Sequence, residues 1–368
     1  MTGRLLIVSH ACVLPANQSV FVFLADRGWE TDVVVPDHWA HEYAEGSVAA
    51  AKLASLEARL HPLPVALAGQ PQRHFYTRGA CSRLLRRLRP QVAFLEEESF
   101  SAPAFQWGVA CWRHRVPFGV QAAENLDRAL PAPARIFRAW TLRHAAFVAA
   151  RSPTAKQLAE RWGARGQVEV IPHAVPSWPK VGNDSQDDRF TIGFAGRLVE
   201  EKGIFDLLEA ARRLPGHVRL LLAGNGPLRS RLERAGSEKV TIEIASDIKH
   251  EDMARAFGEM DVLVLPSRTT PTWVEQFGRV LVEALWCGVP VLGSSSGEIP
   301  WVIEATGGGL VFPEGDAVAL AAALEELRAS PEKRIRLAEA GRQSVERLFS
   351  VEAAGRLLDD ALSAAIRR

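Results

Sequence analysis

The sequence has few cysteines and no long hydrophobic run, and both absences exclude classes of protein. The four cysteines are scattered and follow no CxxC or Cys/His pattern, which argues against a zinc cluster and favours buried free thiols in a reducing compartment. No apolar run approaches the roughly 18 residues that a membrane-spanning helix needs. The amino terminus enters a predicted strand too early for a signal peptide. We therefore expect a cytoplasmic protein without a metal site.

The sequence also has almost no net charge and no glycine motif after its first predicted strand. The formal net charge is +1 over 368 residues, so bulk charge gives no reason to expect a nucleic-acid partner. The turn after the first predicted strand, residues 9–17, contains no glycine. A dinucleotide fingerprint is therefore absent there, which argues against an NAD-dependent enzyme. We expect no bound cofactor.

The sequence does contain a repeated alternation of buried strands and helices. Apolar runs such as Leu5–Val8 and Val262–Leu265 alternate with segments of helical spacing, which predicts βαβ units and parallel sheets in an α/β fold. The length favours two domains, and a polar, proline-bearing segment marks the linker between them. We predict an amino-terminal domain at 1–175, a linker at 176–189 and a second domain at 190–350.

The clearest functional pattern follows the predicted strand Val262–Leu265. A helix is predicted from near Gly278 to Gly288, where the glycine and a nearby proline end it. The free backbone N–H groups of Phe277, Gly278 and Arg279 would point out of the helix start. The helix dipole favours an anion at that position.

Two carboxylates accompany this helix start. Glu275 precedes the helix and Glu283 lies within it, about 12 Å apart at a helical rise of about 1.5 Å per residue. That separation is similar to the reach from a hexose to a ribose across a diphosphate. The pattern suits a nucleoside diphosphate sugar, although an ordinary amphipathic helix with solvated glutamates has the same spacing.

Basic and glycine-containing turns follow two other predicted strands of the second domain. One strand ends at Gly196 and Arg197, and Lys202 follows shortly after. The planar guanidinium and the compact ammonium match a diphosphate leaving group and would neutralise it without a metal. Surface salt bridges are the alternative for both residues. Gly224 opens a Gly-x-Gly-Pro turn, which is a weak signal by itself.

In the first domain, polar residues follow three predicted strands. They are His10, Glu97 within the run Glu96–Glu98, and Glu124 with Asn125. Ligands bind beyond the carboxyl ends of parallel strands, so we expect these residues on the wall of an acceptor site. Solvation of the glutamates and a structural role for His10 are the alternatives.

Two basic clusters bear on membrane contact. The predicted helix Arg83–Arg89 has a cationic face beside its leucines, and Arg135, Arg138 and Arg143 lie around Trp140 in the sequence. A solvated cationic face is the simpler interpretation. Peripheral contact with anionic lipid on the inner face of the membrane is the other.

The motif Glu275-x7-Glu283, set in Glu-Gln-Phe-Gly-Arg-Val-Leu-Val-Glu-Ala and followed by Cys-Gly-Val-Pro-Val, resembles the donor motif of the retaining GT-B glycosyltransferases of family 4. The residues around Arg197 and Lys202 resemble the diphosphate site of that family. The resemblance implies a GT-B fold, in which two Rossmann-like domains face each other across a cleft. It also implies that the last helix, 351–368, packs back on the amino-terminal domain.

The resemblance implies an activity and roles for the residues. We expect retaining transfer of a sugar from a nucleoside diphosphate sugar to an acceptor hydroxyl, with UDP commoner than GDP in the family. No strong protein base is required if the leaving phosphate takes the acceptor proton. The implied contacts are Arg197 and Lys202 to the diphosphate, Glu275 and the amides of Phe277, Gly278 and Arg279 to the hexose, Glu283 to the ribose, and Gly196 and Gly224 beside the nucleotide. Arg279 is charged where many relatives carry an apolar residue, which suggests a reach to phosphate or acceptor.

The acceptor stays open among a glycan, a lipid-linked glycan and a small metabolite. Two rival functions also remain. A sugar-nucleotide epimerase on the same scaffold is excluded if the products contain a new glycosidic bond. A sugar-nucleotide-binding subunit that needs a partner is excluded by turnover of this chain alone.

Overall fold

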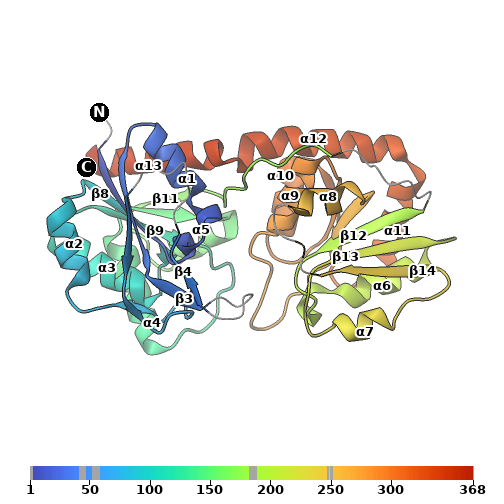
Figure 1. Ribbon diagram of the computed structural model, residues 1–368, viewed down its shortest axis with the longest axis horizontal. Coiled ribbons are helices and arrows are strands. Elements are labelled where there is room, and N and C mark those ends of the chain that lie inside the picture. Colours follow the sequence, from blue (N-terminus) through green and yellow to red (C-terminus); the bar gives the residue numbers. More distant parts are fainter. Residues whose placement is uncertain are drawn as a thin grey trace. The chain divides into compact units, whose positions relative to one another are not determined.

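The computed structural model describes residues 3–40, 47–51, 59–181, 189–246, 248 and 252–367. Contacts divide the chain into two compact units (Figure 1). Unit 1 comprises Met1–Ala174 and Val351–Arg368, and unit 2 comprises Val175–Ser350. The middle of the predicted linker 176–189 lies outside the described residues.

Unit 1 contains a seven-stranded sheet in which each neighbouring pair of strands is parallel. In sheet order the strands are β11 (Gln167–Val170), β10 (Phe147–Ala150), β9 (Phe118–Ala122), β8 (Val92–Glu98), β1 (Arg4–Val8), β2 (Glu30–Pro36) and β5 (Arg59–Leu63). Two short antiparallel pairs accompany it, β3 (His38–Ala40) with β4 (Ser47–Ala49) and β6 (Val65–Ala66) with β7 (Phe75–Tyr76). The carboxyl ends of β8, β1 and β9 therefore meet at one edge.

Helices cover both faces of this sheet, because alternate residues of a strand point to opposite sides. Leu6 and Val8 of β1 join a core that also contains buried residues of α2 (Ala80–Leu88), α3 (Ala102–Arg113), α4 (Ala132–His144) and α5 (Pro153–Arg161). Leu5 and Ile7 join a second core with α1 (Ser19–Asp26) and α13 (Val351–Arg367). Burial on both faces explains why these strands are almost continuously apolar.

The carboxyl-terminal helix α13 belongs to unit 1 although its residues follow unit 2 in the sequence. It packs along α1, where a Cβ added to Gly355 would lie 2.2 Å from Phe23 Cδ1. Asp359 on α13 accepts hydrogen bonds from Arg27 Nε at 2.7 Å and from Trp29 Nε1 at 2.8 Å. Close packing at Gly355 and the two hydrogen bonds of Asp359 hold α13 on the amino-terminal elements.

Unit 2 contains a six-stranded sheet, also parallel throughout. In sheet order its strands are β14 (Val240–Ala245), β13 (Val218–Ala223), β12 (Phe190–Ala195), β15 (Val262–Leu265), β16 (Val291–Ser294) and β17 (Gly309–Phe312). Its helices are α6 (Ile204–Arg213), α7 (Arg229–Glu233), α8 (Met253–Gly258), α9 (Arg279–Cys287), α10 (Ile299–Thr306), α11 (Ala317–Ala329) and α12 (Pro331–Phe349). One extended apolar core contains buried residues from both the strands and the helices.

The predicted α/β class with parallel sheets is confirmed in both units. The helix predicted between Gly278 and Gly288 is α9, with a left-handed glycine at each cap. All four cysteines are buried and free, as predicted. One strand differs, because the apolar run predicts an end at Leu95 whereas β8 continues to Glu98 past a register shift. Protein partners for the three glutamates, described below, explain why this polar segment is ordered within the sheet.

Candidate active site

In unit 2, the loops that follow β12, β13, β15 and β16 meet at one edge of the sheet, as parallel strands require. Backbone hydrogen bonds join these loops. Leu198 N donates to Asn225 O at 2.9 Å, and Glu298 N donates to Glu275 O at 3.1 Å. The predicted donor-site residues thus belong to one connected set of loops and the helix start that follows, which contain Gly196, Arg197, Lys202, Gly224, Glu275, Phe277, Gly278, Arg279 and Glu283.

Lys202 and Glu275 link the loop after β12 to the loop after β15. Lys202 Nζ lies 2.6 Å from Glu275 Oε2, and Ser267 Oγ donates to the same oxygen at 2.9 Å. The ammonium also lies 5.0 Å from the centroid of the Trp273 ring. An ammonium has three N–H donors, so Lys202 can keep this partner while it donates to a phosphate. The sequence interpretation missed Ser267 and Trp273, although Trp273 lies only two residues before Glu275.

Arg197 is an exposed cation at the same edge of the sheet. It follows Gly196 at the end of β12, and both residues are exposed. Among the described residues, no carboxylate pairs with its guanidinium. By contrast, nearby Arg268 is held by Asp206 at 2.6 Å. The Arg197 fork is therefore available to an anionic ligand.

The start of α9 supplies backbone donors. Helix α9 follows Gly278, whose φ of 71° is left-handed. The N–H groups of Gly278 and Arg279 have no backbone acceptor among the residues that the structure describes, as expected for a first turn. Phe277 is 4% exposed and packs on Phe349 with ring centroids 5.5 Å apart. Its buried ring anchors the backbone, so the amides rather than the ring are presented to a ligand.

Glu283 lies one turn into α9 and is buried. Burial raises the pKa of Glu283, against the charge of Arg279 and its hydrogen bond, which lower it. Arg279 Nε donates to Glu283 Oε1 at 2.8 Å. Arg279 is therefore the helical partner of Glu283, and its side chain is 40% exposed. The expected reach of its guanidinium to a phosphate or acceptor stays a prediction. The ion pair orients the carboxylate for a hydroxyl ligand.

Two glycines allow the loops after β12 and β13 to approach closely. Gly196 has a φ of 148° and Gly224 a φ of 152°. A Cβ added to Gly224 would lie 1.9 Å from Gly196 O. Any side chain at 224 would force these two loops apart, because backbone cannot yield as a flexible side chain does.

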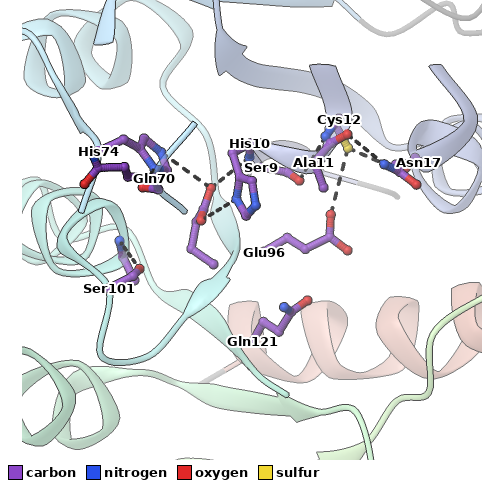
Figure 2. Close-up of polar contacts among 12 residues, drawn as sticks. Ser9, His10, Ala11, Cys12, Asn17, Gln70, His74, Glu96, Ser101 and Gln121 are labelled. Carbon is purple, nitrogen blue, oxygen red and sulfur yellow. Dashed lines mark hydrogen bonds and ion pairs between the residues drawn. The ribbon is translucent and has the colours of Figure 1, made fainter. Parts of the chain in front are cut away.

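In unit 1, the structure brings His10 and Glu97 into direct contact. His10 N donates to Glu97 Oε1 at 2.8 Å, and His10 Nδ1 lies 2.7 Å from Glu97 Oε2 (Figure 2). The His10 ring also lies 5.0 Å from the Trp39 ring and 5.7 Å from the His74 ring. Trp39 and His74 carried no motif, and no signal in the sequence placed them here.

The other two glutamates of the run have protein partners as well. Glu96 Oε1 lies 2.7 Å from Arg151 Nη2, and Arg151 also donates to Gln121 Oε1 at 2.6 Å. Glu98 Oε1 accepts the backbone N–H of Ala123 at 2.9 Å. The alternative that the run is simply solvated is therefore wrong, because Arg151, which follows β10, and the backbone of Ala123, which follows β9, are fixed partners of Glu96 and Glu98.

Glu124 and Asn125 lie at the same edge, after β9. Both are buried, and Glu124 Oε2 accepts a hydrogen bond from Arg128 Nε at 2.9 Å. The negative charge of Glu124 contributes to the raised pKa of Glu98. The structure thus places Glu124 beside the glutamate run, but it provides no direct contact between Glu124 and His10.

Glu98 gives a test of this packing. Burial is the largest cause that raises the pKa of Glu98 to about 7, and Oε2 of its carboxyl has no hydrogen-bond partner among the described residues. The folded state favours the protonated form of Glu98. The free energy of unfolding therefore falls as the pH rises from about 4.5 through about 7, where Glu98 becomes charged. We expect Glu98→Gln to gain about 1–3 kcal/mol over wild type between pH 5 and pH 8, measured by urea unfolding. Exposed Glu352→Gln is the control, and an equal pH dependence in both variants would refute the assignment.

A basic hollow lies on unit 1, at the edge where the strands begin. Its volume is about 970 Å³, and none of the described residues that line it is acidic. The basic and aromatic lining residues are Arg86, Arg89, Arg115, His114, His144, Trp112 and Phe118. The three arginines form no ion pair within the described chain. Trp112 is 57% exposed, so both charge and an aromatic ring are presented to the outside.

The residues of the two predicted basic clusters lie in different surroundings. On α2, Leu84 and Leu85 are buried in the core while Arg86 and Arg87 are exposed, so its apolar face is not available to lipid. In the second cluster, the Arg138 guanidinium lies 4.1 Å from the Trp162 ring. Trp140 packs instead inside unit 1, against residues that include Phe105 and His144.

No set of three or more His, Cys, Asp or Glu side chains within the described ranges is arranged to hold a metal ion. Of the helices that the structure describes, none combines the length and apolar character needed to cross a membrane.

The fold and site define a class of protein, and comparisons with known proteins give its family. Residues 180–344 match the family described as "Glycosyl transferases group 1", and residues 22–177 match "Glycosyltransferase Family 4". The fold is that of the GT-B glycosyltransferases. Together the two matches span both units, and the chain belongs to the family 4, or group 1, glycosyltransferases.

Individual relatives have low sequence identity to this chain. The chain is 33% identical over 171 residues to the lipopolysaccharide core biosynthesis glycosyltransferase LpsE of Rhizobium meliloti, covering 46% of this chain and 48% of the relative. It is 29% identical over 228 residues to a GDP-mannose-dependent monoacylated phosphatidylinositol monomannoside mannosyltransferase of Corynebacterium glutamicum, covering 57% and 59%. The chain thus spans about half the length of the curated relatives it matches. A solved structure, Anabaena HepE in complex with UDP, has a TM-score of 0.73 at 18% identity and covers 99% of this chain and 100% of its own.

Proposed function

We propose that this chain transfers a hexose from a UDP-sugar to a hydroxyl of a lipid-linked glycan or related acceptor. The observation that carries the proposal is the connected set of loops in unit 2, where a lysine–glutamate pair, an open helix start and an arginine without a carboxylate partner among the described residues occur together. The HepE structures contain UDP and UDP-glucose, which favours UDP as the nucleotide. LpsE is named for the lipopolysaccharide core and the mannosyltransferase for a phosphatidylinositol monomannoside, which favours a lipid-linked acceptor.

The diphosphate contacts are assigned from charge. Arg197 has no counterion in the described part of the chain, so it donates two parallel N–H groups to the phosphates. Lys202 contributes a second cation that is already positioned by Glu275. As the bond from the sugar to the phosphate breaks, these cations stabilise the charge that develops on the leaving group. Gly196 and Gly224 leave room for the diphosphate beside the backbone.

The sugar contacts are assigned from the helix start. The amides of Phe277, Gly278 and Arg279, with Glu275, hydrogen-bond the hexose hydroxyls. Glu283, oriented by its neighbour on α9, accepts from the ribose hydroxyls. In unit 1, His10, Glu97, Glu124 and Asn125 form the acceptor side. Transfer proceeds with retention and without a metal ion.

The proposal is tested by turnover of the purified chain alone. The donors are UDP-glucose, UDP-galactose, UDP-N-acetylglucosamine and GDP-mannose, each offered with octyl α-glucoside, octyl α-galactoside or octyl α-mannoside in the presence of EDTA. We expect release of UDP and an α-linked octyl disaccharide, identified by mass spectrometry and NMR. An epimerised sugar nucleotide without a new glycosidic bond would contradict the proposal. So would turnover that requires a second protein or a divalent cation.

The basic hollow of unit 1 supports the further proposal that the protein contacts the membrane. Three unpaired arginines without a lining carboxylate attract an anionic lipid headgroup, and Trp112 is of the residue type that favours the membrane interface. Each arginine near an anionic surface contributes about 1 kcal/mol. The occupant is therefore the phosphate of an anionic lipid, which would bring unit 1 to the inner face of the membrane where a lipid-linked acceptor resides.

We expect the triple variant Arg86→Gln/Arg89→Gln/Arg115→Gln to lose about 100-fold in affinity for phosphatidylglycerol vesicles, since three contacts of about 1 kcal/mol are removed. Binding is measured by cosedimentation. The matched control is Arg234→Gln/Arg336→Gln/Arg347→Gln, which removes the same charge from exposed positions of unit 2. Equal binding of the two triple variants, or equal binding of wild type to phosphatidylcholine vesicles, would contradict this assignment.

A further inference from the structure

A second cavity lies in unit 2, where α9 and α12 pack against each other (Figure 1). We call it the α9–α12 cavity. Its lining includes Gly288, the carboxyl-terminal cap of α9, and Asp261 and Pro290, which directly precede β15 and β16. The donor loops follow the opposite ends of those strands. The cavity is therefore separate from the candidate donor site, and its volume of about 360 Å³ is typical of small-molecule sites.

Two charged residues of the lining satisfy each other. Arg334 Nη2 lies 3.3 Å from Asp261 Oδ1, and Arg334 Nη1 donates to Leu327 O at 2.7 Å. Asp261 Oδ2 also accepts the backbone N–H of Thr191 at 2.8 Å. The charges of Asp261 and Arg334 balance, and both side chains are held by the protein. Neither is left for a ligand.

Two other cations of the lining have no such partner. Lys180 is exposed and Arg342 is half-buried, and within the described ranges neither forms an ion pair or a side-chain hydrogen bond. Lys180 lies beside the carboxyl end of α9, with its Cγ 3.5 Å from a Cβ added to Gly288. Of the acidic residues in the described lining, Glu339 is exposed and belongs to no ion pair. The unpaired charge of the cavity is therefore two cations against one carboxylate.

Arg342 indicates that a hydrogen-bond acceptor is missing. Its guanidinium carbon lies 5.8 Å from the centroid of the Trp286 ring, and Trp286 is 5% exposed. Arg342 Nη1 and Trp286 Nε1 are both buried, and neither has a hydrogen-bond partner among the residues that the structure describes. Buried donors in native proteins nearly always have an acceptor. Two neighbouring donors without one suggest that an acceptor comes from outside the chain.

The rest of the lining is mostly apolar. Met260, Pro290, Ile335 and Ala338 contribute hydrocarbon surface, and Ile335 is 57% exposed. An inorganic anion at the arginine would leave this surface in contact with water. A ligand with an apolar body beside its negative charge would cover it, which is favourable.

We propose that the α9–α12 cavity binds a small amphiphilic anion, either an acyl carboxylate or an alkyl phosphate. Arg342 holds the anionic head, because its planar fork of N–H groups matches a carboxylate or a phosphate. Lys180 adds a second positive charge. The apolar body lies on Ile335 and Pro290. The inference does not rest on the proposed function, since none of these residues belongs to the candidate donor site.

Isothermal titration of the whole chain with four probes tests the class of ligand. The probes are hexyl phosphate, hexanoate, inorganic phosphate and hexanol. We expect saturable binding of hexyl phosphate or hexanoate, and the tighter of the two identifies the head group. Inorganic phosphate and hexanol each lack one half of the ligand, so they should bind at least about tenfold more weakly. Absence of binding by both amphiphilic anions, or equal binding of hexanol or inorganic phosphate, overturns the inference.

Variants locate the site. Arg342→Gln is expected to lower the affinity for the tighter anion at least about tenfold, and Lys180→Gln should lower it by less because Lys180 is exposed. The matched control is Arg336→Gln, which removes an exposed arginine of α12 that does not line the cavity and should bind as wild type does. Arg197→Ala should also bind the anion normally.

Two comparisons decide the result. Equal affinity in Arg342→Gln and Arg336→Gln overturns the inference, and so does a loss of anion binding in Arg197→Ala alone, which would place the anion on the donor loops. If circular dichroism shows that Arg342→Gln does not fold, Lys180→Gln against Arg336→Gln decides instead. Failure of the wild-type chain to bind UDP overturns the proposed function and leaves this inference standing.

Discussion

Arg197→Ala is expected to lower kcat by roughly 100- to 1,000-fold while the protein stays folded. The guanidinium is exposed and without a carboxylate partner in the described chain, so its removal leaves no buried charge unpaired and costs little stability. Its expected role is to stabilise the charge that forms on the departing diphosphate. That interaction is stronger in the transition state than in the bound donor, so kcat falls more than KM rises.

Two further variants sharpen this result. Arg197→Lys keeps the charge but not the planar fork, and we expect an intermediate rate. Arg234→Ala removes an exposed arginine from the same unit and should leave the rate unchanged. Lys202→Ala should also lower the rate, although it additionally frees Glu275. Full activity of Arg197→Ala and Lys202→Ala would remove the diphosphate site from the scheme.

Gly224→Ala is expected to abolish UDP binding and to destabilise unit 2 by about 3–5 kcal/mol. Its φ of 152° is unfavourable for alanine, and the new Cβ would lie 1.9 Å from Gly196 O. The clash is with backbone, so relief requires the loops after β12 and β13 to separate. Those loops carry the glycine and arginine that are expected to meet the diphosphate. Differential scanning calorimetry with and without UDP measures both effects.

The matched control for backbone strain is Gly216→Ala. Gly216 also has a positive φ, of 70°, but its Cβ would meet only the end of the Arg328 side chain, at 3.3 Å. We expect a loss of about 1 kcal/mol from the left-handed conformation and normal UDP binding. If Gly224→Ala and Gly216→Ala had the same effect on UDP binding and stability, the close approach of the two loops would not be needed for function.

The arrangement of the candidate donor side was predictable from the sequence because its signals are local. The strand Val262–Leu265, Glu275, the glycine caps of α9 and Glu283 fall within one short stretch. Each follows from a rule that acts over a few residues, such as a buried apolar run or a glycine beyond a helix end. The contact between Lys202 and Glu275 spans 73 residues, and the family resemblance rather than the spacing brought these two into one site.

The acceptor side was less predictable because its contacts are long-range. His10 and Glu97 are 87 residues apart, and nothing near either residue indicates the other. The extension of β8 to Glu98 was missed for the same reason, since a run of three glutamates predicts solvent unless the positions of Arg151 and Ala123 are known. Trp39 and His74 join the site through packing that no periodic pattern encodes.

The central claim is that the loops of unit 2 bind a nucleoside diphosphate without a metal ion. Isothermal titration of UDP into the chain in the presence of EDTA tests it most directly. The expected result is saturable binding to one site per chain, weakened at least about tenfold by Arg197→Ala, because a charge-assisted contact is worth about 1.5–3 kcal/mol, and left unchanged by Arg234→Ala. No heat of binding with EDTA present, or equal affinity in the two variants, would contradict the claim.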